Sequence, residues 1–179
     1  MPLMKQKEII ERHKADLPTD DFVEFLKREV ASFGENMQFD ALDMLIMQYA
    51  VAYITTPYKK TIIELLQLAT PYYEQQQNER YAQFLCIKGH AYFYTGDYKT
   101  ANAYYHQSIA LATKLKQYHI VSAAMSNIIT QKLKVVPNDI ALQMTKILPI
   151  LHRMRDDTNP KQYYSKLLAH VEAAYDAGK

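Results

Sequence analysis

The sequence of 179 residues predicts an all-α protein, and two observations lead to that prediction. The first is that no stretch alternates apolar and polar residues with the β-branched enrichment of a strand, and that only four residues are glycine. The second is a pair of amphipathic segments between Arg80 and Lys114, in which small and apolar residues recur at the i, i+3, i+4, i+7 spacing of a helix. Because 49% of the residues are hydrophobic, the chain can bury a core as a single domain.

The segment from Arg80 to Lys114 predicts two antiparallel helices joined by a tight turn. One face of each helix carries small and apolar residues: Ala82, Leu85, Gly89 and Tyr92 in the first, and Ala101, Tyr104, Tyr105, Ser108, Ile109 and Ala112 in the second. Between them, Gly96 can adopt the left-handed conformation that closes a helix, and Asp97 can cap the next one. So short a connection predicts an αα-hairpin.

This hairpin resembles the tetratricopeptide repeat. The residues at that family's spacings are Leu85, Gly89, Tyr92, Gly96, Tyr98, Ala101 and Tyr105. The resemblance implies that Gly89 and Ala101 are small because the helices cross closely there, and that the tyrosines at 92, 98 and 105 fill the space beside the crossing. Ser108 and Thr113 depart from the pattern, which prefers Ala and Pro. An ordinary helical core with an aromatic and alanine stripe is the alternative interpretation.

Two degenerate copies flank this repeat (residues 80–116) at a spacing of about 40 residues, over 38–78 and 118–157. In the first copy Ala50 and Tyr53 replace Gly89 and Tyr92, and Pro71 is expected to kink the second helix or end it near Ala69. In the third, Asn127 matches a position where the family often has Asn. Repeats longer than the usual ~34 residues resemble those of bacterial regulatory and peptide-sensing proteins.

The remaining residues are expected to form the ends of one domain over 1–179. Residues 1–36 predict two N-terminal capping helices, the second running from Thr19 or Asp20 to Gly34. Residues 160–179 predict a C-terminal helix, and the last residues of that helix resemble the start of another helix-to-helix turn. This helix is either a solvating cap or the start of a further repeat, and the turn favours a chain that continues into a longer protein.

Composition favours a cytoplasmic protein without a nucleic-acid or membrane partner. The 21 basic and 19 acidic residues nearly balance, unlike the basic surface of a nucleic-acid binder or a membrane-surface protein. The first 14 residues lack the apolar core of a signal peptide, and no apolar run is long enough to span a bilayer. A single cysteine, Cys86, excludes an internal disulfide, as is usual in a reducing compartment.

The sequence contains no pattern typical of an enzyme, a cofactor site or a metal site. Four scattered glycines do not form a phosphate-binding loop, and the six histidines include no pair at helical metal-ligand spacing. Cys86 has no neighbouring base in sequence and is expected to be a small apolar residue near the inner surface. We therefore expect a non-catalytic protein that needs no cofactor.

The resemblance implies a right-handed superhelix of stacked hairpins whose first helices line a concave groove. The groove positions that it implies are Gln48, Val51, Cys86, His90, Tyr94, Asn127, Thr130 and Lys134. Such a lining suits an extended peptide held by amide, imidazole and amine hydrogen bonds. It lacks the cluster of cations that would clamp a terminal carboxylate, and a face that is simply solvated is the alternative.

Function is predicted to be that of a scaffold that binds a peptide, a protein partner or a downstream domain of its own chain. The resemblance suggests a sensory or regulatory N-terminal module of a bacterial signalling protein. The alternative is a homo-oligomerisation element, such as a homodimer held by exposed tyrosines. Because neighbouring helical positions cannot both point inward, one member of Tyr72-Tyr73 and one of Tyr163-Tyr164 are expected to be exposed or at an interface.

Overall fold

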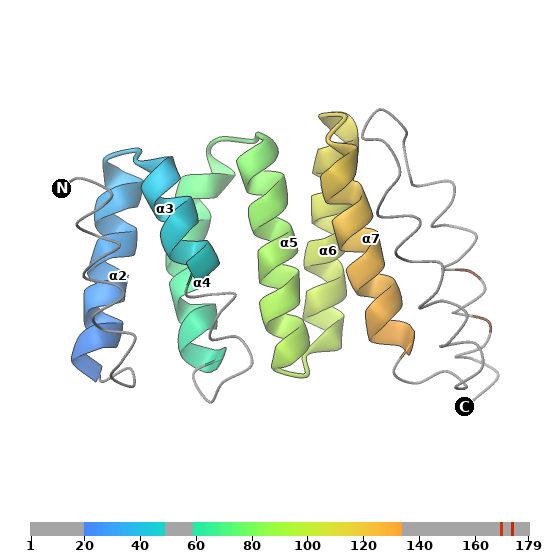
Figure 1. The fold of residues 1–179 in the computed structure, drawn as a ribbon, viewed down its shortest axis with the longest axis horizontal. Helices are drawn as coiled ribbons and strands as arrows, with labels where there is room; N and C mark the ends of the chain where they lie inside the picture. Colours follow the sequence, from blue (N-terminus) through green and yellow to red (C-terminus); the bar gives the residue numbers. More distant parts are fainter. Residues whose placement is uncertain (1–19, 49–58, 134–168, 170–172, 174–179) are drawn as a thin grey trace. The chain divides into compact units, whose positions relative to one another are not determined.

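The computed structural model describes residues 20–48 and 59–133, together with Ala169 and Ala173, and every regular element longer than one residue in that part of the chain is a helix (Figure 1). The helices are α2 (Asp20–Glu35), α3 (Phe39–Ile46), α4 (Lys59–Glu74), α5 (Glu79–Tyr94), α6 (Tyr98–Lys114) and α7 (Tyr118–Leu133). The predicted all-α class is confirmed for these residues. None of these helices combines the length and the apolar character needed to cross a membrane. The chain divides into two compact units, Met1–Gln75 and Gln76–Lys179.

The turns that precede α3, α5 and α7 share one backbone feature. Each contains a residue with positive φ, at Met37 (54°), Gln77 (47°) and Lys116 (57°), and these positions are 40 and 39 residues apart. In the first turn the Gln38 N–H donates to the Phe33 carbonyl at 2.8 Å, and in the last the Gln117 N–H donates to the Ala112 carbonyl at 2.8 Å. These are the bonds of a Schellman motif, which satisfies the last carbonyls of a helix. The described residues therefore form a repeat-like helical fold with a period of about 40 residues.

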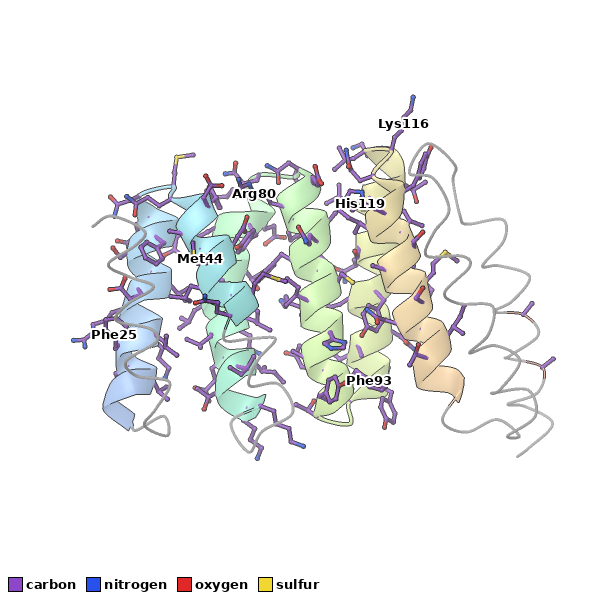
Figure 2. The ribbon with its side chains drawn as sticks, in the orientation of Figure 1. Phe25, Met44, Arg80, Phe93, Lys116 and His119 are labelled. Carbon is purple, nitrogen blue, oxygen red and sulfur yellow. The ribbon has the colours of Figure 1, made fainter. Side chains whose placement is uncertain are left out.

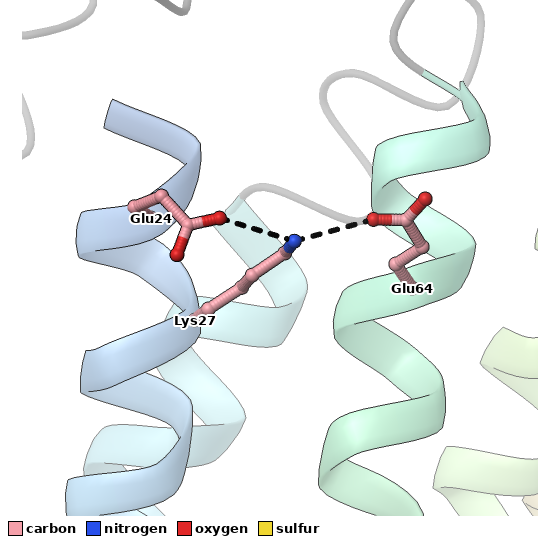
Figure 3. Close-up of polar contacts among 3 residues, drawn as sticks. All are labelled: Glu24, Lys27 and Glu64. Atoms are coloured by element: carbon pink, nitrogen blue, oxygen red, sulfur yellow. Dashed lines mark hydrogen bonds and ion pairs between the residues drawn. The ribbon is translucent and has the colours of Figure 1, made fainter. Parts of the chain in front are cut away.

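In the first unit, α2 packs against both α3 and α4. The buried residues are Leu26, Val30 and Phe33 on α2, Leu42, Leu45 and Ile46 on α3, and Ile62, Leu65, Leu66, Ala69 and Tyr73 on α4. At the surface, the Lys27 Nζ lies 3.3 Å from a Glu24 carboxylate oxygen and 3.4 Å from one of Glu64, which joins α2 to α4 (Figure 3). Because all three side chains are solvated, the apolar contacts and not this ion pair hold the unit together.

Helix α4 continues through Pro71 to Glu74, so of the two predicted outcomes, a kink or an end near Ala69, the end near Ala69 is wrong. Proline removes one backbone N–H, but so close to the end of the helix this costs a single hydrogen bond in the last turn. The last turn is anchored by Tyr73, which is 1% exposed and whose hydroxyl donates to the Asp43 Oδ1 at 2.6 Å. Burial of that ring and its bond to α3 offset the lost bond.

Both tyrosines of the pair at the end of α4 pack within the first unit. Tyr73 is buried, whereas Tyr72 is half-buried over Gly34, where an added Cβ would overlap its ring. The residue with some exposed surface is thus Tyr72, and part of its ring is covered by α2. Tyr163 and Tyr164 lie outside the described residues.

The second unit begins with the predicted hairpin of α5 and α6. Gly96 has φ 85°, and its N–H donates to the Phe93 carbonyl at 3.1 Å. The Asp97 Oδ1 accepts from the Thr100 N–H at 3.1 Å and caps α6. A Cβ added to Gly89 would lie 2.7 Å from the Tyr105 ring and 3.1 Å from the Ala101 carbonyl oxygen. The expected turn, cap and close crossing are all confirmed.

The tyrosines beside this crossing differ in burial. Tyr105 is 1% exposed, and Tyr92 is half-buried and stacks on Tyr104 with ring centroids 5.5 Å apart. Tyr98 is 48% exposed, so its predicted place in the core is wrong. As the first residue of α6 it lies beyond the crossing, and its ring contacts Phe93 at 5.4 Å near the turn.

The core of the second unit also includes α7, which packs on α6 and contacts α5. Its buried residues are Ala82 on α5, Ala101, Tyr105, Ile109 and Ala112 on α6, and Ile120, Val121, Ala124, Met125, Ile128 and Ile129 on α7. Ser108, which stands where the repeat pattern prefers Ala, is fully buried, and its hydroxyl donates to the Ala82 carbonyl at 2.7 Å. This bond satisfies the one polar group that the substitution adds.

Candidate functional site

Five of the eight predicted groove residues lie on α5 and α7. Cys86, His90 and Tyr94 follow one another by a turn along α5, and Asn127 and Thr130 occupy one side of α7. We call these five residues the α5–α7 face. Gln48 belongs to the first unit, where its Oε1 is buried without a hydrogen-bond partner in the described part of the chain. Val51 and Lys134 lie outside the described residues.

A direct contact between Asn127 and Cys86 joins the two helices of the α5–α7 face. The Asn127 Nδ2 donates to the Cys86 Sγ at 3.7 Å, within hydrogen-bond range for sulfur. Cys86 also packs against the core formed by α6 and α7. The contact uses one of the two amide hydrogens of Asn127, so the other hydrogen and the Oδ1 are not taken up by it.

The Cys86 thiol is kept in its neutral form. Although the residue retains some exposed surface, burial raises its pKa from 9.0 to about 11, and the hydrogen bond from Asn127 offsets only part of that increase. A thiolate is the nucleophilic form of cysteine, and a high pKa makes it scarce at neutral pH. Cys86 therefore acts here as a packing residue and as a weak hydrogen-bond acceptor.

The other half of the α5–α7 face is aromatic. The rings of His90 and Tyr94 meet edge to face with centroids 4.9 Å apart, and Tyr94 continues into Phe93 at 5.3 Å. Burial lowers the pKa of His90 below its usual value, which favours the neutral imidazole with one donor and one acceptor nitrogen. Tyr94 is 37% exposed and Thr130 is exposed, so both can be reached from solvent.

Buried Tyr105 of α6 lies close enough to the α5–α7 face to interact with it electrostatically. Burial, and then repulsion from the ionised forms that Cys86 and Tyr94 take at high pH, raises the pKa of the Tyr105 hydroxyl above its usual value. The face is thus neutral as well as polar: an amide, an imidazole, two hydroxyls and a thiol. Such groups can exchange hydrogen bonds with a ligand but carry no charge of their own.

Across residues 20–48 and 59–133, no three His, Cys, Asp or Glu side chains are grouped so that they could hold a metal ion.

Comparisons of the chain with protein-family models, with curated proteins and with solved structures found no match.

One buried residue of α5, Lys88, was not singled out by the sequence pattern. Its side chain is 4% exposed, and its Nζ lies 4.3 Å from the Tyr104 ring centroid and 5.9 Å from that of Phe84. A cation over the face of an aromatic ring is favourable. Spacing could have indicated the contact with Phe84, which lies one helical turn from Lys88, but not the nearer ring of Tyr104, which belongs to α6.

The high pKa of Cys86 predicts slow alkylation of the folded protein. At about pH 8, iodoacetamide should modify Cys86 at least tenfold more slowly in the native chain than in urea, because far less thiolate is present. Since the folded-state pKa is the higher one, deprotonation of the unfolded chain should also lower the stability as the pH rises from about 9 to about 11. Mass spectrometry of the alkylated fraction measures the first effect. Equal alkylation rates in the native chain and in urea would contradict a raised pKa for Cys86 in the folded protein.

Proposed function

We propose that this protein is a non-catalytic scaffold of the tetratricopeptide-like kind that binds an extended peptide on the α5–α7 face. In a cell it would serve as a regulatory module of a cytoplasmic bacterial signalling protein. The observation that carries the proposal is the 3.7 Å contact between Asn127 and Cys86, because it holds an amide side chain between two adjacent helices.

An amide in this position matches the needs of a peptide backbone. Each peptide group offers one hydrogen-bond donor and one acceptor, and a side-chain amide can accept from the first and donate to the second at the same time. Because Asn127 is already held by Cys86, less rotamer entropy is lost when a ligand binds. His90 adds a neutral donor and acceptor, and Tyr94 adds an exposed ring on which an apolar side chain can pack.

The protonation states of the α5–α7 face support binding more than catalysis. A cysteine nucleophile needs a thiolate stabilised by a neighbouring imidazolium or another positive group. Here burial shifts the pKa of Cys86 upward and that of His90 downward, so both groups are held neutral. Neutral groups interact with peptide amides without the desolvation cost of a charge.

A peptide selection tests the proposal. The full chain is immobilised and presented with a display library of random linear peptides of roughly 12 residues, and enriched peptides are measured by fluorescence anisotropy. We expect dissociation constants in the micromolar range and a loss of at least tenfold, or ~1.4 kcal/mol, in Asn127→Ala. Gln107→Ala, an exposed amide change on α6, should leave the affinity unchanged.

Two results would contradict the proposal. One is a selection that enriches no peptide, and the other is a set of peptides whose affinity is the same for the native chain and for Asn127→Ala. A dimer that forms with increasing concentration and is lost when exposed Tyr98 is replaced by Ser would instead favour self-association. Light scattering on the same samples measures the mass.

A further inference from the structure

The two units of the chain carry opposite net charge, although the whole chain is nearly neutral. Met1–Gln75 contains 8 basic and 12 acidic residues, a net charge of −4, and Gln76–Lys179 contains 13 basic and 7 acidic residues, a net charge of +6. The near balance seen over the full sequence therefore conceals a basic unit, and this unit contains the α5–α7 face. Solvated charges act over about 10 Å at moderate salt, so exposed charges of the second unit that lie near the face contribute to the potential that a ligand meets there.

Part of the basic charge of the second unit lies at the surface of its described residues. Over residues 76–133 six side chains are basic, and Lys99, Lys114 and Lys116 among them are exposed. Lys99 lies at the start of α6 and Lys116 just after its end, so exposed positive charge occurs at both ends of the hairpin. Figure 2 shows Lys116 with Arg80 and His119 at one end of the unit and Phe93 at the other.

The acidic side chains of the same residues are engaged elsewhere. Only Glu79 and Asp97 are acidic in 76–133. A Glu79 carboxylate oxygen lies 3.3 Å from the His119 Nε2, and Asp97 caps α6 through the Thr100 N–H. Hydrogen bonds from the Thr100 side chain and from its N–H lower the pKa of the Asp97 carboxyl. Neither of them is a residue of the α5–α7 face. No described residue of the face carries a negative charge that would repel an anionic ligand.

We infer that the peptide bound by the α5–α7 face is acidic, with several Asp or Glu side chains that the basic second unit attracts. This inference rests on the proposed function and adds the chemical class of the ligand. The neutral groups of the face would hold the backbone, while the lysines beyond it would favour carboxylates through the field they create. Because most of this attraction is between solvated charges, it should depend strongly on salt.

The test uses the peptides obtained from the selection described above. We expect Asp and Glu to be enriched relative to the starting library. The strongest binder is then synthesised again with each carboxylate replaced by its amide, and we expect at least tenfold weaker binding in about 50 mM NaCl. At about 500 mM NaCl the two peptides should differ by less than about threefold, because screening shortens the reach of the lysines.

A matched pair of charge-reversal variants locates the effect. The double variant Lys99→Glu with Lys116→Glu should reduce the ratio of the affinities for the acidic peptide and its amide counterpart at least fivefold. Arg28→Glu with Lys60→Glu makes the same change in net charge on exposed residues of the first unit and should have little effect. Thermal melting by circular dichroism confirms that both variants are folded.

The outcomes separate this inference from the proposed function. If no peptide depends on Asn127, the proposed function fails and the inference fails with it. If Asn127-dependent peptides bind but show no preference for carboxylates, or if both charge-reversal pairs weaken binding equally, only the inference is overturned. It is also overturned if a DNA duplex of roughly 16 base pairs binds more tightly than the acidic peptide, since the field would then act on any polyanion.

Discussion

Tyr105→Ala is expected to lower the free energy of unfolding by about 3–5 kcal/mol, which is most of the stability of a marginal domain. The Tyr105 ring is 1% exposed and fills the space above Gly89 where α5 and α6 cross. Neither helix can move in to fill the cavity, because the Ala101 carbonyl already lies close to the Gly89 position. Urea unfolding of the full chain, followed by circular dichroism, measures the loss. Tyr105→Phe, which keeps the ring, should cost less than about 1.5 kcal/mol.

A second substitution shows whether the ring acts through its contact with Gly89. In the native background Gly89→Ala should destabilise the protein by about 1–2 kcal/mol, because its Cβ would meet the Tyr105 ring at 2.7 Å. In the Tyr105→Ala background the overlap with the ring is gone and only the 3.1 Å approach to the Ala101 carbonyl oxygen remains, so the higher helix propensity of alanine, about 1 kcal/mol, should offset more of the cost. The effect of Gly89→Ala is therefore expected to diminish or change sign. An identical cost in both backgrounds would show that the two residues are not coupled.

The hairpin of α5 and α6 could be predicted from sequence because local chemistry determines it. Only glycine is at ease at the φ of 85° observed at Gly96, and Asp97 is a residue that caps the helix it precedes. Gly89 is explained by the close approach of two segments that a three-residue turn brings back together. None of these features depends on parts of the chain that are distant in sequence.

The α5–α7 face could be predicted only in part. Helical periodicity places Cys86, His90 and Tyr94 on one side of α5, and this needs no knowledge of the tertiary structure. The contact of Asn127 with Cys86 joins residues 41 positions apart and depends on how α7 packs beside α5. The sequence indicated the helices that meet, but not which atoms touch. Gln48, predicted for the same groove, lies in the other unit.

Other differences from the sequence predictions have local physical causes. Tyr98 was expected in the core from its place in the repeat pattern, but the first residue of α6 lies outside the helix crossing and remains exposed. Pro71 was expected to kink α4 or end it near Ala69, but the helix continues to Glu74 because burial of Tyr73 outweighs one missing hydrogen bond. In both cases the sequence pattern identified the correct helix. At the end of that helix, the degree of burial determined the difference from the prediction.

Lys88→Glu is expected to lower the free energy of unfolding by about 3 kcal/mol or more. The native ammonium lies over the Tyr104 ring in a position that is 4% exposed, where the negative face of the ring favours a cation. A carboxylate placed there would be buried against that same face, and an uncompensated buried charge is among the costliest changes in a core. Lys88→Met keeps much of the length of the side chain without its charge and should cost less than about 2 kcal/mol. Urea unfolding at about pH 7 measures both variants.

The pH dependence of the variants separates charge from shape. Burial raises the pKa of a glutamate, so Glu at this position would take up a proton in the folded state before the unfolded state does. Stability of Lys88→Glu relative to Lys88→Gln should therefore increase as the pH falls from about 7 to about 5, because in that range the folded state binds more protons. Lys88→Gln, which fills similar space without a titrating group, provides the reference at each pH. A constant difference between these two variants over that range would mean that shape and lost contacts, and not charge, make Lys88 necessary.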